Sequence, residues 1–87
     1  MQFSYVYVLQ SKTKNFLYVG FTHNLRKRFV EHNNKEELST KPYAPFDLIF
    51  YEAYRSEKDA KRREEYFKTT KGKTTLRAML KEHFKRV

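Results

Sequence analysis

The chain has 87 residues, a formal net charge of +9 and no cysteine. Its length suits a single domain over residues 1–87 and leaves no room for a second. The lack of cysteine excludes disulfides, thiolate metal sites and cysteine nucleophiles, and it fits a reducing, cytoplasmic location. The N-terminal segment lacks a signal-peptide pattern, and no stretch approaches the roughly 20 apolar residues that span a bilayer, so we expect no membrane partner.

The positive charge is concentrated in the last third of the chain. Residues 1–54 hold seven Lys or Arg against five Asp or Glu, whereas residues 55–87 hold twelve against five. A basic field of this kind favours a polyanion such as nucleic acid, and a solvated helical surface is the alternative. Aromatic residues make up 17% of the sequence, which is enough to fill a modest core and argues against disorder.

The first two predicted elements are strands. Residues 3–9 alternate two faces of aromatic and β-branched side chains, and residues 16–20 have the same composition. With a polar loop at residues 11–14, an antiparallel register would pair Tyr7 with Tyr18. Two phenols would then stand side by side on one face of the sheet.

The second strand leads into a helix. The same register sets Gly20 opposite Tyr5, and a glycine at the end of a strand often marks the close approach of a ligand or backbone. Residues 22–24 then offer N-cap candidates. We expect a helix of about three turns that ends at His32 or Asn34.

Helical geometry separates the polar side chains of this first helix. Leu25 and Phe29 define its apolar side, and Arg28 and His32 flank that side one turn apart, where both could donate to the same anion. A guanidinium held there suits a phosphate because its donors form a planar fork. The alternatives are a solvated Arg28 whose stem covers the core edge and a His32 that belongs to that edge.

The middle of the chain is a loop followed by a strand. Residues 33–45 are polar and interrupted by proline, and this loop is as long as many functional surface loops. Residues 47–54, "DLIFYEAY", are rich in aromatic and aliphatic side chains. We expect them to form the third strand.

The last third is predicted to be helical. Ser56 and Asp59 have the spacing of a capping box and open a second helix that runs to about Thr70, where Gly72 ends it. A third, amphipathic helix is expected over about residues 74–86. Its apolar face is expected to pack against the core.

One carboxylate of the second helix lies among apolar residues. Ala60, Glu64 and Phe67 share a face of that helix, whereas Glu65 faces solvent. Burial of a carboxylate without a partner would cost several kcal/mol, so Glu64 should be paired with a cation, hydrogen-bonded or bound to a metal. An ordinary helical ion pair with Lys68 is the simplest of these alternatives.

The residues singled out so far are two tyrosines, Arg28, His32 and Glu64. The sequence shows no Ser/His/Asp arrangement, no phosphate-cradling glycine loop and no carboxylate cluster for two metals. It could build a single-metal phosphodiester site, with Glu64 holding Mg²⁺ or Mn²⁺ and Arg28 stabilising the charge that develops on phosphate. A tyrosine would have to align or deprotonate the attacking water, for which an ordinary pKa of about 10 is unfavourable.

The order of these residues resembles that of the GIY-YIG nuclease domain family. The two short motifs of the family look like Tyr5-Val6-Tyr7 and Tyr18-Val19-Gly20, and the arginine and histidine that follow them match Arg28 and His32. The resemblance covers roughly residues 3–72. It is closest to the small stand-alone bacterial members related to the nuclease module of the excision-repair incision subunit.

The resemblance implies an α/β fold, with a three-stranded antiparallel sheet flanked by helices, and divalent-metal-dependent hydrolysis of phosphodiester bonds. It matches the metal-binding glutamate of the family to Glu64, and it implies that Tyr7 is the general base with Tyr18 assisting. This sequence departs from the family pattern in two places. Tyr5 replaces the leading glycine of the first motif, and residues 69–80 contain no counterpart of a downstream asparagine.

The first functional hypothesis is a metal-dependent endonuclease that cleaves DNA, in repair or recombination, and finds its substrate through its own charge, a protein partner or homodimerisation. The alternative is a catalytically silent nucleic-acid-binding module with the same fold. A protein-interaction domain with solvated basic helices is the third reading. The basic residues expected to contact nucleic acid are Arg26, Lys27, Lys61, Arg63, Lys68 and Lys71.

Overall fold

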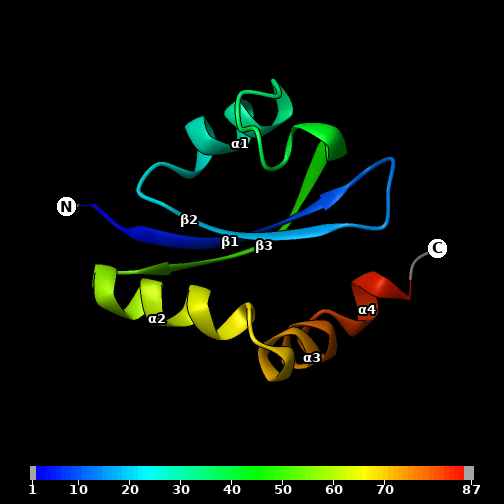
Figure 1. The fold of residues 1–87 in the computed structure, drawn as a ribbon. Coiled ribbons are helices and arrows are strands. Elements are labelled where there is room, and N and C mark those ends of the chain that lie inside the picture. Colours follow the sequence, from blue (N-terminus) through cyan, green and yellow to red (C-terminus); the bar gives the residue numbers. More distant parts are fainter. Residues whose placement is uncertain (1, 86–87) are drawn as a thin grey trace.

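The computed structural model describes residues 2–85, which form three strands and four α-helices around one sheet (Figure 1). The predicted fold, a three-stranded antiparallel sheet flanked by helices, is confirmed. In chain order the elements are β1 (Ser4–Ser11), β2 (Leu17–Thr22), α1 (Leu25–Asn33), a 3₁₀ turn (Lys41–Tyr43), β3 (Phe46–Tyr54), α2 (Glu57–Phe67), α3 (Thr70–Met79) and α4 (Lys81–Phe84).

Strand β1 is the centre of the molecule. The strand order is β2-β1-β3, so β1 alone is paired on both edges. Helix α1 and the loop that follows it cover one face of the sheet, and α2, α3 and α4 lie against the other (Figure 1). Because β1 has neighbours on every side, its side chains supply most of the buried strand residues.

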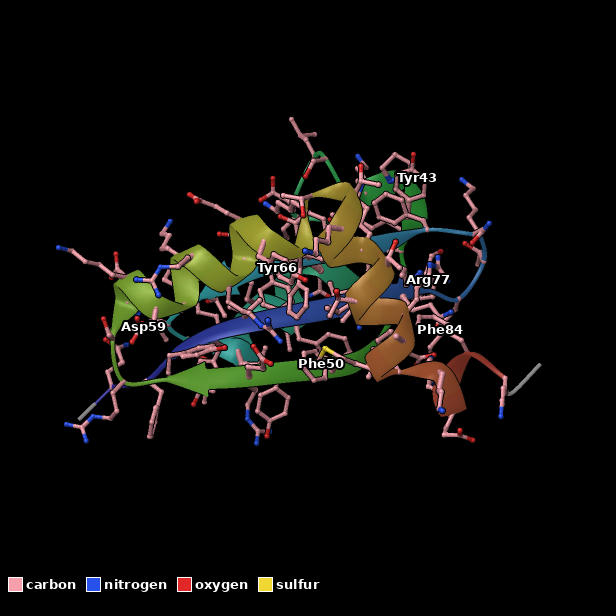
Figure 2. All side chains as sticks on the ribbon, turned by 90° about the horizontal axis from the view of Figure 1, so that it is seen from below. Tyr43, Phe50, Asp59, Tyr66, Arg77 and Phe84 are labelled. Carbon is pink, nitrogen blue, oxygen red and sulfur yellow. The ribbon has the colours of Figure 1, made fainter. Side chains whose placement is uncertain are left out.

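The alternation predicted for the first strand explains how one strand fills two cores. Val6 and Val8 face α2 and α3, whereas Tyr7 and Leu9 face α1. The side of the sheet covered by α2 and α3 is seen face-on in Figure 2. Since successive side chains of a strand point to opposite faces, a single eight-residue strand joins both apolar layers.

The register between β1 and β2 differs from the prediction by two residues. Tyr7 lies opposite Gly20, and Tyr18 lies opposite Leu9. The prediction that Tyr7 pairs directly with Tyr18 is therefore wrong, as is the pairing of Gly20 with Tyr5. Because side chains alternate with a period of two, a shift of two residues leaves both tyrosines on the same face.

The reason for the shift is the side chain of Ser11, which was predicted to begin the loop and instead ends β1. Its hydroxyl oxygen accepts hydrogen bonds from the backbone N–H groups of Thr13 and Lys14, at 3.2 and 3.0 Å. This local turn is closed by the Ser11 N–H, which donates to the Phe16 carbonyl at 3.0 Å. A serine that bonds to nearby backbone in this way is a common turn device, and it moves the loop toward the second strand.

Helix α2 is attached to the sheet by an ion pair as well as by its apolar face. Arg63 donates to both carboxylate oxygens of Glu52 in β3, at 3.0 and 3.2 Å, and lies over the Phe67 ring at 4.3 Å. Glu52 also accepts from the Tyr54 hydroxyl at 2.6 Å, and burial together with this carboxylate raises the pKa of Tyr54 to about 12. Planar, bidentate pairing is the geometry that arginine favours with carboxylates.

The predicted boundaries of the first two helices are close to those observed. Asn24 caps α1 and its side chain accepts from the Lys27 N–H, in agreement with the expected cap at residues 22–24. Ser56 stands at the N-cap of α2, but its side chain makes no capping hydrogen bond, so the predicted capping box is not formed. Helix α2 ends at Phe67 rather than near Thr70.

The largest error concerns Gly72, which was predicted to end the second helix. Gly72 lies inside α3, which begins at Thr70 and is capped by the Thr69 hydroxyl, an acceptor for the Gly72 N–H at 3.0 Å. A Cβ on Gly72 would collide with the backbone carbonyl oxygen of Tyr66. The glycine is therefore required for the close approach of α3 to the end of α2.

The third helix is also interrupted, unlike the single helix predicted over residues 74–86. Helices α3 and α4 are separated at Leu80, which caps one and precedes the other. Residue 86 of the predicted helix lies outside the described residues. Within residues 2–85, none of the helices combines the length and apolar character that crossing a membrane requires.

We predict that Gly72→Ala lowers the free energy of unfolding by about 1 to 3 kcal/mol, because the new methyl group forces α3 away from Tyr66. The matched control is Thr74→Ala, an exposed position of the same helix, where alanine should be neutral or mildly stabilising. Urea unfolding of both variants gives the comparison. Equal stability of Gly72→Ala and the wild type would show that α3 does not depend on this contact.

Candidate active site

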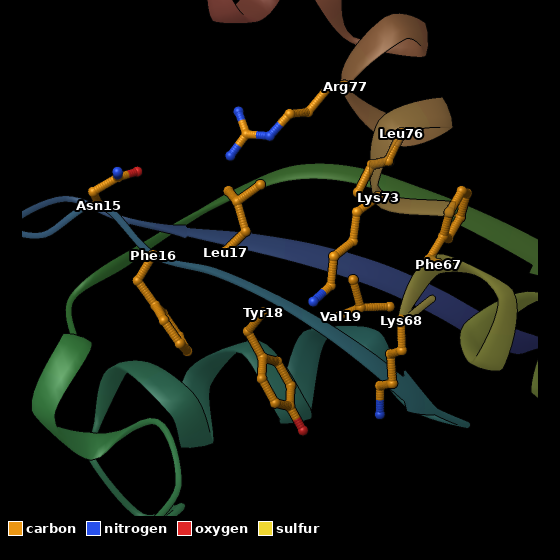
Figure 3. A pocket seen from close by; sticks show the side chains of 10 residues that line it. All are labelled: Asn15, Phe16, Leu17, Tyr18, Val19, Phe67, Lys68, Lys73, Leu76 and Arg77. Atoms are coloured by element: carbon orange, nitrogen blue, oxygen red, sulfur yellow. The ribbon is translucent and has the colours of Figure 1, made fainter. Parts of the chain in front are cut away.

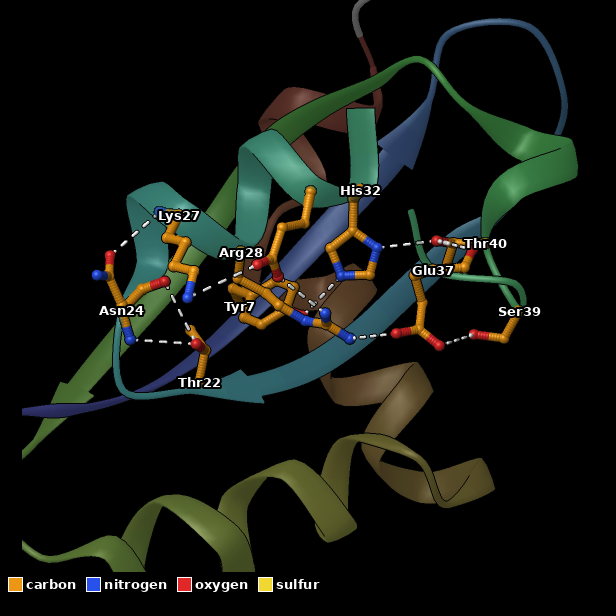
Figure 4. Close-up of polar contacts among 10 residues, drawn as sticks. Tyr7, Thr22, Asn24, Lys27, Arg28, His32, Glu37, Ser39 and Thr40 are labelled. Atoms are coloured by element: carbon orange, nitrogen blue, oxygen red, sulfur yellow. Dashed lines mark hydrogen bonds and ion pairs between the residues drawn. The ribbon is translucent and has the colours of Figure 1, made fainter. Parts of the chain in front are cut away.

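The candidate site begins with Tyr7, at the middle of β1. Its side chain is 1% exposed and points toward α1. The Tyr7 hydroxyl lies 2.9 Å from Nε2 of His32, which comes from the last turn of α1 (Figure 4). A residue in the central strand and a residue in the covering helix are thus joined by one buried hydrogen bond.

Gly20 makes the position of the Tyr7 phenol possible. It stands opposite Tyr7 in β2, and a Cβ there would collide with the phenol carbon and hydroxyl of Tyr7. The same Cβ would lie 2.8 Å from the ring of Tyr18. The glycine therefore leaves the space that the Tyr7 ring occupies, in line with the close approach predicted for it.

The second ring nitrogen of His32 is also engaged. Nδ1 lies 2.8 Å from the Thr40 hydroxyl, which has the Glu37 carbonyl as its own acceptor at 3.4 Å. Thr40 then accepts from the Nδ1–H of His32, and Nε2 accepts the hydroxyl proton of Tyr7. His32 is fully buried, and burial followed by the Arg28 charge lowers its pKa, so the ring is neutral near pH 7.

The structure corrects one expectation for His32. The histidine was expected to present a donor to the same anion as Arg28, or to lie at the edge of the core. It lies inside the core, and both of its nitrogens are occupied by Tyr7 and Thr40. Its partner is therefore the phenol rather than an anion at the surface.

Arg28 is held by two carboxylates. One terminal nitrogen donates to Glu31 at 3.1 Å, and the other donates to Glu37 at 2.7 Å (Figure 4). Glu37 raises the pKa of Arg28 and Arg28 in turn lowers the pKa of Glu37, as expected for an ion pair. The guanidinium is partly exposed and carries five N–H donors. The two carboxylates therefore fix its orientation and leave other N–H groups free to donate.

Glu37 and Thr40 are site residues that the sequence interpretation missed. Both lie in the loop between α1 and β3, which had been noted only for its length. One fixes Arg28 through its carboxylate, and the other fixes His32 through its hydroxyl. No local pattern reveals these contacts, because they join residues eight or nine positions apart through a turn.

The second tyrosine completes an aromatic cluster. The Tyr18 ring centroid is 6.2 Å from that of Tyr7 and 5.1 Å from that of His32. Burial is the main reason that the pKa of Tyr7 is raised, Tyr18 adds to the increase, and Arg28 opposes it. The Tyr7 phenol is consequently protonated at neutral pH and needs an acceptor for its proton before it can act as a base.

Glu64 approaches this cluster from α2. Its side chain is 15% exposed and its carboxylate accepts from the Lys68 ammonium at 2.9 Å, which is the simplest of the pairings that the sequence allowed. Glu65 is exposed, as predicted. The Glu64 charge makes the smallest of the contributions to the pKa of the Tyr7 phenol, in the direction that raises it.

A divalent ion at this place would have to be held by Glu64 together with water and substrate oxygens. Residues 2–85 contain no group of three or more His, Asp or Glu side chains arranged to hold a metal. Mg²⁺ commonly keeps several waters and binds through one or two carboxylates together with substrate phosphates. A single partly exposed carboxylate is compatible with that mode, provided that the Lys68 ammonium shares the oxygen or moves aside.

Tyr5, which replaces the leading glycine of the family pattern, lies beside the cluster. Its ring centroid is 6.1 Å from that of Tyr51 in β3. It lines a surface hollow together with Arg26 and Leu48, near the start of α1. The replacement of glycine by Tyr5 thus changes the surface beside the cluster. Tyr7, two residues later, still forms its hydrogen bond to His32.

The predicted nucleic-acid-binding residues lie in two groups. Arg26 and Lys27 are exposed on α1, whereas the others lie on the α2 and α3 side of the sheet (Figure 1). In that second group Lys61 lies over the Phe21 ring at 4.5 Å and Lys68 is paired with Glu64. Two further members are Lys71, which is exposed, and Arg63, whose charge is balanced by Glu52.

The fold and the cluster together define a class of protein. The central strand carries Tyr7, and the adjacent strand carries Tyr18 and Gly20. The following helix carries Arg28 and His32. The GIY-YIG catalytic domain matches residues 3–78, which is most of the chain. The chain belongs to the GIY-YIG family, a nuclease-type family.

The curated relatives are small bacterial proteins. A UPF0213 protein of Clostridium perfringens (strain 13 / Type A) is 38% identical over 66 residues, which cover 75% of this chain and 70% of the relative. A UPF0213 protein of Streptococcus pyogenes serotype M5 (strain Manfredo) is 35% identical over 83 residues, covering 94% of this chain and 89% of the relative. No solved structure matches the chain.

We predict that Gly20→Ala displaces the Tyr7 phenol and breaks its hydrogen bond to His32. The added methyl group overpacks a buried contact, so the free energy of unfolding should fall by about 1 to 3 kcal/mol. The His32 ring signals in an NMR spectrum should move at the same time. Unchanged signals and stability would mean that the strand tolerates a side chain opposite Tyr7.

The protonation of His32 should make stability depend on pH. Its pKa is lower in the folded protein than in the unfolded chain, where histidine titrates near 6.5, so stability should fall as pH drops below about 6.5. His32→Gln should remove this part of the slope, which is at most about 1.4 kcal/mol per pH unit. Denaturant unfolding at several pH values measures the slope, and an NMR titration of His32 at or above its ordinary pKa would contradict the assignment.

Proposed function

We propose that this protein is a metal-dependent endonuclease that hydrolyses phosphodiester bonds in DNA. The observation that carries the proposal is the buried hydrogen bond from Tyr7 to His32, next to the oriented guanidinium of Arg28. In a chain of the GIY-YIG family, this arrangement supplies a proton acceptor and a phosphate-binding group at one place.

The proton path runs through Tyr7. The phenol gives its proton to Nε2 of His32 and takes one from the attacking water, so that the water oxygen forms its bond to phosphorus as the proton leaves it. Because Nε2 of neutral His32 receives the phenol proton as the water proton arrives, Tyr7 relays the proton and need not form a free phenolate, which its raised pKa disfavours. The bond to the leaving oxygen of the phosphodiester breaks, and solvent protonates that oxygen.

Two residues bear on the negative charge that develops on the phosphate: Arg28 directly, and Glu64 through the cation that it would hold. The N–H groups of Arg28 that are not bound to Glu31 and Glu37 can donate to a phosphate oxygen, where negative charge accumulates during attack. Glu64 is the residue that would hold Mg²⁺ or Mn²⁺, and the ion would add Lewis-acid stabilisation of the phosphate oxygens. Tyr18, whose ring lies beside the rings of both Tyr7 and His32, assists by aligning the water.

The basic surface supports binding to a nucleic-acid backbone. Arg26, Lys27, Lys61 and Lys71 are exposed and suited to phosphate contacts, with Arg63 and Lys68 contributing to the same field. Such a domain would act in repair or recombination in the cytoplasm, and a protein partner or a homodimer would direct it to its substrate. The alternative is a module of the same fold that binds nucleic acid without cleaving it.

A cleavage assay tests the proposal. Purified wild type, Tyr7→Phe and Glu64→Gln should be incubated with supercoiled, single-stranded and branched DNA in Mg²⁺, Mn²⁺ or EDTA. We expect metal-dependent nicking that falls by at least about 100-fold in Tyr7→Phe and is abolished in Glu64→Gln. The matched control is Glu65→Gln, which removes an exposed carboxylate of the same helix and should keep full activity.

Two further measurements separate the alternatives. Glu64→Gln should keep the wild-type stability, since Lys68 is exposed and becomes solvated, and it should lose the heat of Mn²⁺ binding measured by calorimetry. Cleavage that survives Glu64→Gln would refute the assigned site. No cleavage of any DNA by the wild type, with salt-dependent binding retained, would establish the silent binding module.

A further inference from the structure

A groove lies between the edge strand β2 and helix α3. It has a volume of about 470 Å³. Leu17 and Val19 of β2 face Leu76 of α3 across it, and three cations, Lys68, Lys73 and Arg77, stand along its side (Figure 3). The groove thus combines apolar walls with positive charge.

The positive charge of this groove is not balanced within it. No Asp or Glu lines the groove. Lys68 is paired with Glu64, but in the part of the chain that the structure describes, neither Lys73 nor Arg77 has a carboxylate within ion-pairing distance. Arg77 instead lies over the Phe84 ring at 4.9 Å, at the end of the molecule shown in Figure 2. Lys73 and Arg77 are exposed helical residues that can bind an anion without breaking an ion pair within residues 2–85.

The groove is continuous with the candidate active site. Tyr18 lines the groove and is also in the aromatic cluster with Tyr7 and His32. Lys68, which lines the groove as well, is bound to Glu64. Figure 3 shows the Tyr18 hydroxyl and the Lys68 ammonium on one side of β2, with Arg77 on the other side and Lys73 reaching between them. The cations therefore mark a path from α3 over the edge of β2 to the cluster.

The size of the groove favours a single unpaired nucleotide over a duplex. Pockets of about 300 to 1,000 Å³ hold single small-molecule groups, so the groove suits one nucleotide. A duplex does not enter it, since paired and stacked bases present no free face to such walls. The apolar walls suit the face of a base, which must be unstacked and unpaired to reach them.

We propose that this groove binds an unpaired nucleotide of a DNA strand, next to the phosphate that reaches Tyr7. The inference rests on the proposed function and deepens it, because it assigns a substrate class: DNA with a single-stranded tail or branch at the cleavage point. The base lies against Leu17, Val19 and Leu76, and the flanking phosphates meet Lys73 and Arg77. Backbone N–H groups on the outer edge of β2 offer further donors, because β2 pairs only with β1.

Binding measured without catalysis tests the groove. Fluorescently labelled duplex DNA, blunt or with a single-stranded tail at one end, is titrated with protein in EDTA at several salt concentrations. The wild type should prefer the tailed duplex. Lys73→Ala should weaken binding of the tailed duplex about fivefold and reduce the salt dependence of log Kd by about 0.7, the value for one phosphate contact on a single strand.

The control is Lys58→Ala, which removes another exposed lysine, from α2 and outside the groove. It should leave the preference for the tailed duplex unchanged, whereas Lys73→Ala should reduce that preference. Leu17→Glu, which places a negative charge in the groove wall, should abolish the preference. Circular dichroism and thermal unfolding confirm that each variant is folded before its affinity is interpreted.

The outcomes distinguish this inference from the proposed function. Equal affinity for blunt and tailed duplexes, or equal effects of Lys73→Ala and Lys58→Ala, would overturn the groove assignment even if Glu64-dependent cleavage is observed. Stronger binding to an RNA tail of the same sequence would overturn the assignment to DNA. A Lys73-dependent preference for tailed DNA supports the groove, and it does so even if the wild type cleaves nothing, in which case only the proposed catalysis fails.

Discussion

The hydrogen bond between Tyr7 and His32 is the interaction on which the arrangement of the site depends. It joins β1, the central strand of the sheet, to the helix that covers one face of the sheet. Gly20 leaves room for the phenol, and Thr40 fixes the tautomer that lets the imidazole accept from it. Because every member is buried and satisfied, the network holds one orientation of Tyr7 and gives its proton one destination.

The loop between α1 and β3 controls the same network from outside. Glu37 holds the guanidinium of Arg28, and three residues later Thr40 holds the imidazole of His32. A single loop thus positions both the guanidinium that we propose binds phosphate and the imidazole that we propose accepts the proton. Because the arginine is already oriented by carboxylates, binding of a phosphate to it would cost less side-chain entropy.

The two faces of the sheet contribute different parts of the candidate site. The α1 face holds the tyrosines, the histidine and the arginine, whereas α2 and α3 contribute Glu64 and the basic groove. They meet at β2 because it is an edge strand, past which side chains from both faces can reach. The ion pair of Arg63 with Glu52 and the close contact at Gly72 keep α2 and α3 in place on the second face.

The sequence by itself determined the fold class, the three strands, the first two helices and which side chains those elements carry toward the sheet, because alternation and helical spacing are local properties. Only the tertiary structure decided the strand register, the role of Gly72, the partner of His32 and the part played by Glu37 and Thr40. Each of these depends on contacts between residues that no short period relates: a serine turn, a carbonyl of the preceding helix, a phenol from another strand. Periodicity indicates which side of a helix or strand is buried. Which residues that side contacts depends on how the elements pack together.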